Sequence, residues 1–358
     1  MNNTIKFSII VPCCNVGDYI LPLVKSIREQ TYTNFECLLM IEESTDNTLE
    51  LCQQVVAEDS RFSLSAGPRS GSASLPRNLG IKKATGEYAV FADGDDWLEP
   101  DSLERFAAAI EQHGPVDLIE AAASEILEDD NGKLTFDQKR FNYLPEDDGK
   151  VMTGKEATVR NGQLHPFPYS AVWMTVYRID YLRKNNLEFI PGIIHEDNEW
   201  CPRILFLAEK VLIMDYSFYN YRRHTSSIMG QLKVRDMASS TALMRSLFAF
   251  YAKHQKDVTP DVAFVWQRSW LSLFYYIFFK PENQHGVTET MRKTALKNIF
   301  ANEGLANFRN FMRIASRPKK IAAPFILFGR WWTLPACLFF KYIYYPLVER
   351  RSTQHENA

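Results

Sequence analysis

The chain has 358 residues, of which 46% are hydrophobic and 23% charged, and its formal net charge is -2. This composition is typical of a globular protein, and at roughly 100 to 200 residues per domain the length predicts two units or one large domain with an appendage. The small net charge argues against a general nucleic-acid binder. Six cysteines without CxxC spacing argue against a zinc site or disulfide framework. Because the first residues lack the apolar segment of a secretory signal, we expect the chain in the cytosol.

Four short apolar runs in the first hundred residues are typical of strands buried in a parallel sheet. They lie at 7–11, 35–41, 61–64 and 88–91, with helical patterns between them. Alternating strands and helices predict an α/β fold with a doubly wound, Rossmann-like sheet. The ligand crevice of such a sheet lies at the carboxyl ends of its strands. The polar segments 12–15, 42–46 and 93–96, which follow three of the runs, are therefore expected to converge there.

A different pattern follows from about residue 115. It predicts a strand pair or hairpin around the acidic turn 129–132, a helix near 180–186 and an aromatic strand at 216–221. Beyond these elements only helical patterning remains. We therefore divide the chain into a domain of residues 1–230 and a helical C-terminal region of residues 231–358. The change of pattern near residue 115 divides this domain into two parts, residues 1–114 and residues 115–230.

The C-terminal tail, residues 309–350, is both basic and aromatic. Its apolar runs are interrupted by Arg330 and Lys341, and they are shorter than the roughly 20 residues of a membrane-spanning helix. We interpret the tail as an interfacial segment that lies on the anionic inner face of the cell membrane. The alternative is a helical pair packed on the catalytic core.

Three aspartates follow the strand at 88–91 in the motif Asp93-Gly94-Asp95-Asp96. Like charges this close resist ionising together, and a bound cation is the simplest remedy. Asp-x-Asp at a strand end suits Mg²⁺ or Mn²⁺, because the carboxylates leave coordination positions open for phosphate oxygens. The alternative is a solvated acidic turn before a helix whose N-terminus favours aspartate.

Five segments in this order resemble the family-2 glycosyltransferases, inverting enzymes with a GT-A nucleotide-binding fold that build bacterial surface polysaccharides. They are Ser8–Val16, Ser44–Thr48, Arg77–Gly80 with Gly86–Tyr88, Asp93–Asp96, and Glu196–Asp197 with Tyr221–Arg222 and Ser227–Met229. The resemblance covers roughly residues 6–230, and it implies that residues 1–114 bind the nucleotide sugar and that residues 115–230 form the acceptor side. It implies a mixed sheet and transfer of a sugar from a nucleotide-diphosphate donor, expected to be UDP-linked. The acceptor would be a saccharide, free or lipid-linked, in surface polysaccharide or lipopolysaccharide synthesis at the inner face of the membrane.

The resemblance assigns the metal site to the aspartate motif. Asp95 would be the main ligand of Mn²⁺ or Mg²⁺, and Asp93 would face the ribose or metal-bound water. Asp96 would be a second ligand, and His224 would complete the coordination. The cation would stabilise the negative charge that develops on the diphosphate leaving group.

The catalytic residues implied by the resemblance lie in the second half of the domain. Asp197 corresponds to the general base that deprotonates the acceptor hydroxyl, and Glu196 would bind or orient the acceptor. The alternative for this pair is negative charge at a helix N-terminus. Arg222 is expected to close over the diphosphate, with a solvated strand-end cation as its alternative.

The donor side involves further residues near the strand ends. Pro12, Asn15, Glu42 and Asp46 are expected around the base and ribose, and Arg77 is expected to reach the nucleotide. Asn15 and Asp46 have alternative roles as turn and helix-cap residues, and Arg77 has one as a surface cation.

Departures from the family pattern concern the base and the acceptor. The family usually has Asp-Asp-Gly where this chain has Ile41-Glu42-Glu43, so Glu42 would replace the aspartate that reads the uracil edge. Met174 and Thr175 stand where Asn and Lys are frequent in relatives. Two rival functions remain open: an inactive nucleotide- or carbohydrate-binding scaffold, and a sugar-phosphate nucleotidyltransferase.

Overall fold

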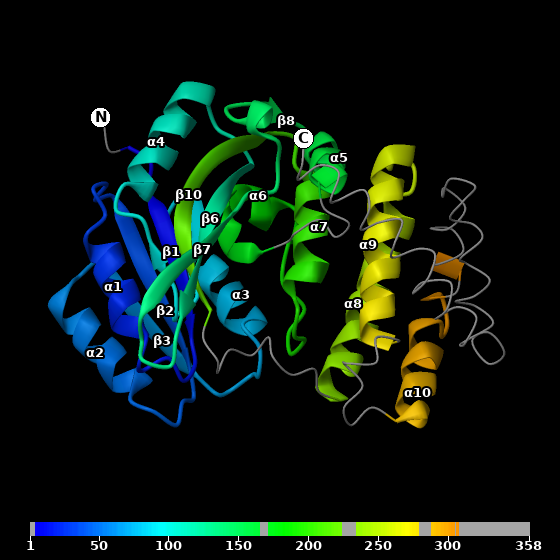
Figure 1. Cartoon of the computed structure of the whole chain (residues 1–358), viewed down its shortest axis with the longest axis horizontal. Helices are drawn as coiled ribbons and strands as arrows, with labels where there is room; N and C mark the ends of the chain where they lie inside the picture. The colour runs from blue at the N-terminus through cyan, green and yellow to red at the C-terminus, as the bar shows by residue number, and fades with distance from the viewer. Residues whose placement is uncertain (1–3, 165–170, 224–233, 279–287, 305, 308–358) are drawn as a thin grey trace. The chain divides into compact units, whose positions relative to one another are not determined.

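The computed structural model describes residues 4–164, 171–223, 234–278, 288–304 and 306–307 (Figure 1). It divides into two compact units, one of residues 1–154 and 170–230 and the other of residues 155–169 and 231–358. His224 and the tail at 309–350 lie outside the described residues. No helix in the described ranges is both long and apolar enough to cross a bilayer.

Ten strands and ten α-helices are present in the described residues. The strands are β1 (Phe7–Cys13), β2 (Phe35–Glu42), β3 (Phe62–Gly67), β4 (Tyr88–Phe91), β5 (Trp97–Leu98), β6 (Leu118–Glu128), β7 (Leu134–Arg140), β8 (Val151–Met152), β9 (Thr175–Arg178) and β10 (Val211–Arg223). The helices are α1 (Ile20–Arg28), α2 (Thr48–Glu58), α3 (Ser74–Lys83), α4 (Ser102–His113), α5 (Gly154–Leu164), α6 (Ile179–Lys184), α7 (Asp197–Leu207), α8 (Val234–Lys253), α9 (Pro260–Phe278) and α10 (Glu289–Ile299). The predicted hairpin is β6–β7, and the aromatic strand is longer than predicted because it begins at Val211.

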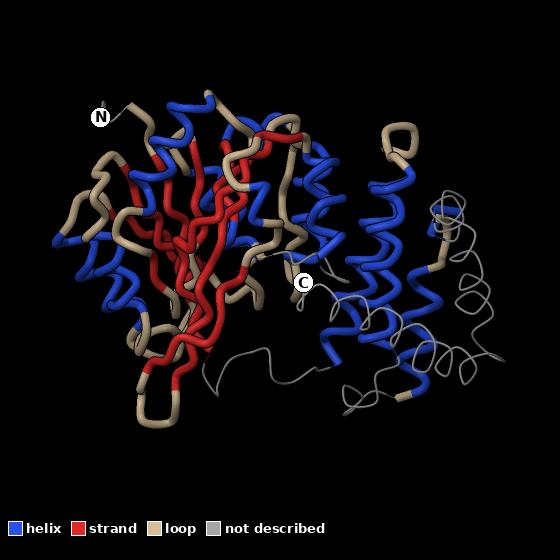
Figure 2. Tube along the Cα trace, turned by 45° about the horizontal axis from the view of Figure 1, so that its top comes forward, coloured by secondary structure: helices blue, strands red, loops and turns tan. Residues whose placement is uncertain are grey.

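The strands form one mixed sheet, the predicted fold class, in the order β3-β2-β1-β4-β9-β6-β10-β5, with β7 on β6 and β8 on β10. Strands β1 to β4 are parallel to one another, whereas β9 runs antiparallel between β4 and β6. The β6–β7 hairpin projects beyond the neighbouring strands (Figure 2). Because β1, β2 and β4 are parallel, their carboxyl ends and the loops that follow lie at one edge of the sheet.

Burial explains which runs became central strands. Phe7, Ile9, Ile10 and Val11 of β1 are all inaccessible to solvent, as expected for a strand covered on both faces. Helix α1 instead buries one stripe of its surface, through Ile20, Leu23, Val24 and Ile27. In the second unit α8 packs against α9 and α10, and the rings of Tyr251 and Trp266 meet edge to face.

Candidate active site

The loops that follow β1 and β2 are tied to each other by side chains. The Asn15 Oδ1 atom accepts a hydrogen bond of 2.8 Å from the backbone N–H of Thr45. The Asp46 carboxylate accepts hydrogen bonds from the N–H groups of Gly17, at 2.9 Å, and Thr48, at 3.1 Å. Asn15 has φ of 53°, a left-handed conformation that asparagine tolerates better than most residues. Both side chains therefore shape the loops, but the N-cap residue of α2 is Asn47 and not Asp46.

Two further predicted donor residues lie at the same edge. Pro12 belongs to β1 and is paired in register with Met40 of β2. Glu42 ends β2 and is buried, and its Oε1 atom accepts hydrogen bonds from both the backbone N–H and the hydroxyl of Ser70. The longer glutamate stem thus reaches the loop between β3 and α3, and it holds that loop beside the end of β2.

Arg77 connects the aspartate motif to the start of α7. It lies in α3, is 5% exposed, and donates hydrogen bonds of 2.7 Å to Asp93 Oδ1 and 2.5 Å to Glu196 Oε1. Its guanidinium also lies 5.7 Å from the centre of the Phe189 ring. Asp93 and Glu196 raise the pKa of Arg77, although burial opposes them, so the arginine is permanently charged. Arg77 is therefore no surface cation, and it brings together segments that are 119 residues apart.

The Asp197 carboxyl lies at the first residue of α7, next to Glu196. Its Oδ1 atom accepts a hydrogen bond of 2.8 Å from the N–H of Asn198. Burial and the neighbouring charge of Glu196 raise the pKa of Asp197 from 3.8 to about 7. The residue before this pair, His195, has φ of 59°, a strained conformation of the kind that clusters at functional sites. A carboxyl with a pKa near neutrality is suited to proton transfer.

Asp96 differs from the other two aspartates of its motif because its carboxyl faces the protein interior. It is 1% exposed, and its two oxygens accept hydrogen bonds from the Tyr219 hydroxyl, at 2.6 Å, and the Arg222 N–H, at 2.7 Å. Burial and the charge of Asp95 raise the pKa of Asp96. These contacts favour a structural role for Asp96 over the predicted role as second metal ligand.

Arg222 is also turned inward. It is 8% exposed, its guanidinium lies 5.1 Å from the Tyr19 ring centre and 5.2 Å from that of Trp97, and Nη1 is 3.2 Å from a Glu128 oxygen. Arg222 is therefore not the solvated strand-end cation of the alternative interpretation, and its closure over a diphosphate stays a prediction. Sequence reasoning missed its partners because they come from three other segments of the chain.

Asp93 and Asp95 are the aspartates of the motif that remain for a divalent cation, because Asp96 is turned inward. Among the described residues, no three His, Cys, Asp or Glu side chains converge as a metal site. Asp93 and Asp95 are both partly exposed, and His224 lies outside the described residues. One or two carboxylates are what Mg²⁺ commonly takes from a protein when substrate phosphates supply the other ligands. The residues therefore fit a cation that binds together with a diphosphate.

Comparison with known proteins supports the resemblance to the family-2 glycosyltransferases independently of the site geometry. Residues 8–173 match the family model described as glycosyl transferase family 2. The uncharacterized glycosyltransferase YibD of Escherichia coli is 31% identical over 232 residues, which cover 64% of each chain, so this chain spans less than two thirds of that relative. Glycosyltransferase GlyG of Streptococcus pneumoniae is 27% identical over 62% of this chain and 72% of its own length.

Solved structures show the same fold. Residues 1–349 of Staphylococcus aureus TarS, in complex with UDP-GlcNAc, align with a TM-score of 0.66 at 19% identity, over 93% of this chain and 89% of that one. A second TarS structure, in complex with UDP, aligns with a TM-score of 0.63. The ordered motifs, the mixed sheet and the family match lead to one conclusion: residues 8–173 match glycosyl transferase family 2, and the chain has the GT-A fold of the glycosyltransferases with which it aligns.

Proposed function

We propose that the chain transfers one sugar from a UDP-linked donor to a saccharide acceptor, with inversion at the anomeric carbon. The observation that carries this proposal is the bridge from Asp93 through Arg77 to Glu196. The bridge places the aspartate motif and the start of α7 in one polar cluster at the carboxyl edge of the sheet. A donor diphosphate and an acceptor hydroxyl need to meet in such a place.

Asp197 acts as the general base in this proposal. Asn198 engages its Oδ1 atom, so Oδ2 receives the proton from the acceptor hydroxyl as that oxygen attacks the anomeric carbon. Arg77 neutralises some of the local negative charge, which keeps Asp197 able to ionise. Glu196 is held by Arg77 and accepts a hydrogen bond from another acceptor hydroxyl. Direct attack from the face opposite the diphosphate needs no covalent intermediate, so one carboxylate suffices.

Asp95 and Asp93 hold Mn²⁺ or Mg²⁺ in the proposed enzyme. The bound cation would offset the negative charge that develops on the leaving diphosphate. Asp93 remains fixed by Arg77 through its Oδ1 atom. Asp96 is left out of this ligand set because both of its oxygens already accept hydrogen bonds.

The donor and acceptor are proposed on chemical grounds. Glu42 Oε1 is engaged by Ser70, and Oε2 would accept the N3–H of uracil. The UDP and UDP-GlcNAc of the TarS complexes support a uridine nucleotide. We place the acceptor among the lipid-linked saccharides of surface polysaccharide or lipopolysaccharide synthesis, because a basic, aromatic tail suits an anionic membrane surface.

Thermal unfolding of the full chain tests this proposal. UDP, GDP, CDP and dTDP would each be added with and without Mn²⁺, to the native chain and to Asp95→Asn. A ligand at a hundred times its dissociation constant stabilises by about 2.7 kcal/mol, so a raised Tm with UDP and Mn²⁺, absent in Asp95→Asn, is expected. No shift with any nucleotide would instead favour the inactive scaffold. A nucleoside triphosphate would also be added together with a sugar phosphate, and a shift with this pair but not with UDP would favour the nucleotidyltransferase.

A further inference from the structure

The hydroxyl of Tyr219 joins the two ends of the aspartate motif. Tyr219 belongs to β10 and is inaccessible to solvent. Its hydroxyl accepts a hydrogen bond of 2.9 Å from the backbone N–H of Asp93 and donates one of 2.6 Å to Asp96 Oδ2. One side chain therefore contacts the residues that flank Gly94 and Asp95.

Neighbouring contacts hold this hydroxyl in place. The Trp173 ring stacks on the Tyr219 ring with centroids 4.7 Å apart and planes at 15°. Further along, β10 returns to the motif, and the Arg222 N–H donates to the other oxygen of Asp96 at 2.7 Å. Three hydrogen bonds thus tie the motif to a single buried strand.

The loop has little freedom on its other side. A Cβ atom at Gly94 would lie 2.9 Å from a Val16 methyl group, so the loop after β1 packs directly against the motif. Removing the Tyr219 hydroxyl would leave the Asp93 N–H and one Asp96 oxygen without partners. Buried polar groups without partners are unstable, and the loop would relax until water reached them.

We propose that Tyr219 is a positioning residue for the metal-binding loop, acting through Asp93 and Asp96 without touching metal or substrate. The inference rests on the proposed function, in which Asp93 and Asp95 hold the cation. It assigns Asp96 a defined purpose, because the buried carboxylate anchors the loop whose other aspartates face the ligand. It also explains why β10, far from the motif in sequence, must end beside it.

Tyr219→Phe tests the proposal, because it removes the hydroxyl and keeps the stacked ring. Binding of Mn²⁺ to the full chain with saturating UDP is measured by calorimetry, and exchange of the Asp93 amide hydrogen is measured in the metal-free protein. We expect about tenfold weaker Mn²⁺ binding, since a buried hydrogen bond contributes about that factor, and faster exchange at Asp93. UDP affinity without metal should change less than about twofold.

Tyr88→Phe is the matched control. The Tyr88 hydroxyl also accepts from a backbone N–H and donates to a carbonyl, both of Val116, and it is similarly enclosed. Unchanged Mn²⁺ affinity in Tyr219→Phe, or an equal loss in both variants, would overturn the proposal. If the native chain binds no Mn²⁺ with UDP, the proposed function itself fails. Should Tyr219→Phe not fold, Asp96→Asn must show the faster exchange at Asp93, which loss of a mere metal ligand would not cause.

Discussion

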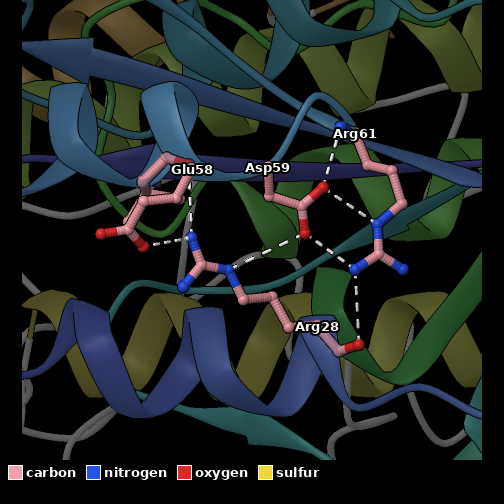
Figure 3. Close-up of polar contacts among 5 residues, drawn as sticks. Arg28, Glu58, Asp59 and Arg61 are labelled. Atoms are coloured by element: carbon pink, nitrogen blue, oxygen red, sulfur yellow. Dashed lines mark hydrogen bonds and ion pairs between the residues drawn. The ribbon is translucent and has the colours of Figure 1, made fainter.

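Two clusters of charged side chains lie at opposite edges of the sheet in the first unit, and they are built differently. One cluster lies at the amino ends of β2 and β3. Arg28 donates a hydrogen bond of 2.9 Å to Glu58, and the Arg61 guanidinium donates two hydrogen bonds to Asp59, of 3.1 and 2.7 Å (Figure 3). Arg28 Nε also lies 3.8 Å from Asp59. This cluster contains two cations and two anions.

The cluster at the carboxyl edge is unbalanced. Arg77 is its central cation, and it contacts Asp93 and Glu196, with Asp197 adjoining the latter. The pKa values reflect the difference, because Arg61 lowers the pKa of Asp59 while burial and Glu196 raise that of Asp197. Charges that are paired within the protein stabilise the fold. A surplus of carboxylates indicates a site where a cation, a substrate proton or both are to be bound.

The largest expected effect is on catalysis. Asp197→Asn keeps the size of the side chain but removes its basicity, so the rate of sugar transfer should fall by about a thousandfold, within the range attributed to general bases. UDP release from a saturating UDP-sugar donor, with or without acceptor, measures this loss. Asp59→Asn at the balanced cluster should keep the native rate. Near-native transfer by Asp197→Asn, with donor binding intact, would remove Asp197 as the base.

The next effect is the loss of unfolding free energy when the arginine of either cluster, Arg77 or Arg28, is replaced. Arg77→Met leaves Asp93 and Glu196 without their buried cation, and breaking such a pair costs about 3–5 kcal/mol of unfolding free energy. Arg28→Met removes a partly exposed cation whose carboxylates can turn to water, so a loss below about 1 kcal/mol is expected. Urea unfolding of both variants measures the contrast. Equal losses of unfolding free energy in the two variants would contradict a difference in burial between the two clusters.

A smaller effect is the change in Tm on removing one carboxylate, and its sign is expected to differ between the two clusters. The folded-state pKa of Asp197 lies above its unfolded value of 3.8, so folding binds the proton more tightly and stability declines as the pH rises from about 4 to about 7. Asp197→Asn should therefore raise the Tm at pH 8 and have little effect on the Tm at pH 4. The folded-state pKa of Asp59 is lowered, so its stabilisation is present at neutral pH and lost in acid. Asp59→Asn should lower the Tm at pH 8. A lower Tm in both Asp59→Asn and Asp197→Asn would contradict the expected difference between the two clusters.

The sequence predicted β1 to β4, the β6–β7 hairpin, β10 and the edge at which polar loops meet, since these follow from local properties. It did not predict β5, β8 and β9. Continuous apolar runs mark buried strands, and parallel strands put their carboxyl ends together. The same reasoning placed Asp93 at that edge, whereas Arg77 and Glu196 entered the predicted site through segments that resemble the family. It could not give the hydrogen bonds among them, because these join residues 16 and 119 positions apart.

Side-chain direction was the feature that the sequence could not provide. Asp95 and Asp96 are adjacent and chemically identical, yet Asp96 is enclosed by Tyr219 and the backbone of Arg222. The Arg222 guanidinium lies between two aromatic rings instead of at the end of an exposed strand. Both outcomes depend on how β10 lies next to β5, a pairing between segments that are distant in the sequence. The aromatic residues at 216–221 were the sequence feature that could have indicated the contact between Tyr219 and Asp96. Core packing alone also accounts for aromatic residues in a strand, so the feature did not indicate this contact specifically.

The smallest effect is a change in nucleotide affinity on replacing Glu42. This residue lies at the carboxyl edge, and Ser70 donates hydrogen bonds to one of its two carboxylate oxygens. If Oε2 accepts the uracil N3–H, Glu42→Gln places an amide donor there, and UDP affinity should fall about tenfold. Cytosine N3 is an acceptor, so CDP affinity should rise and the UDP preference should narrow. Glu43→Gln, next to it and exposed, is the matched control and should leave both affinities unchanged. An unaltered UDP-to-CDP ratio in Glu42→Gln would restrict Glu42 to holding the Ser70 loop, and the base would then be read elsewhere at this edge.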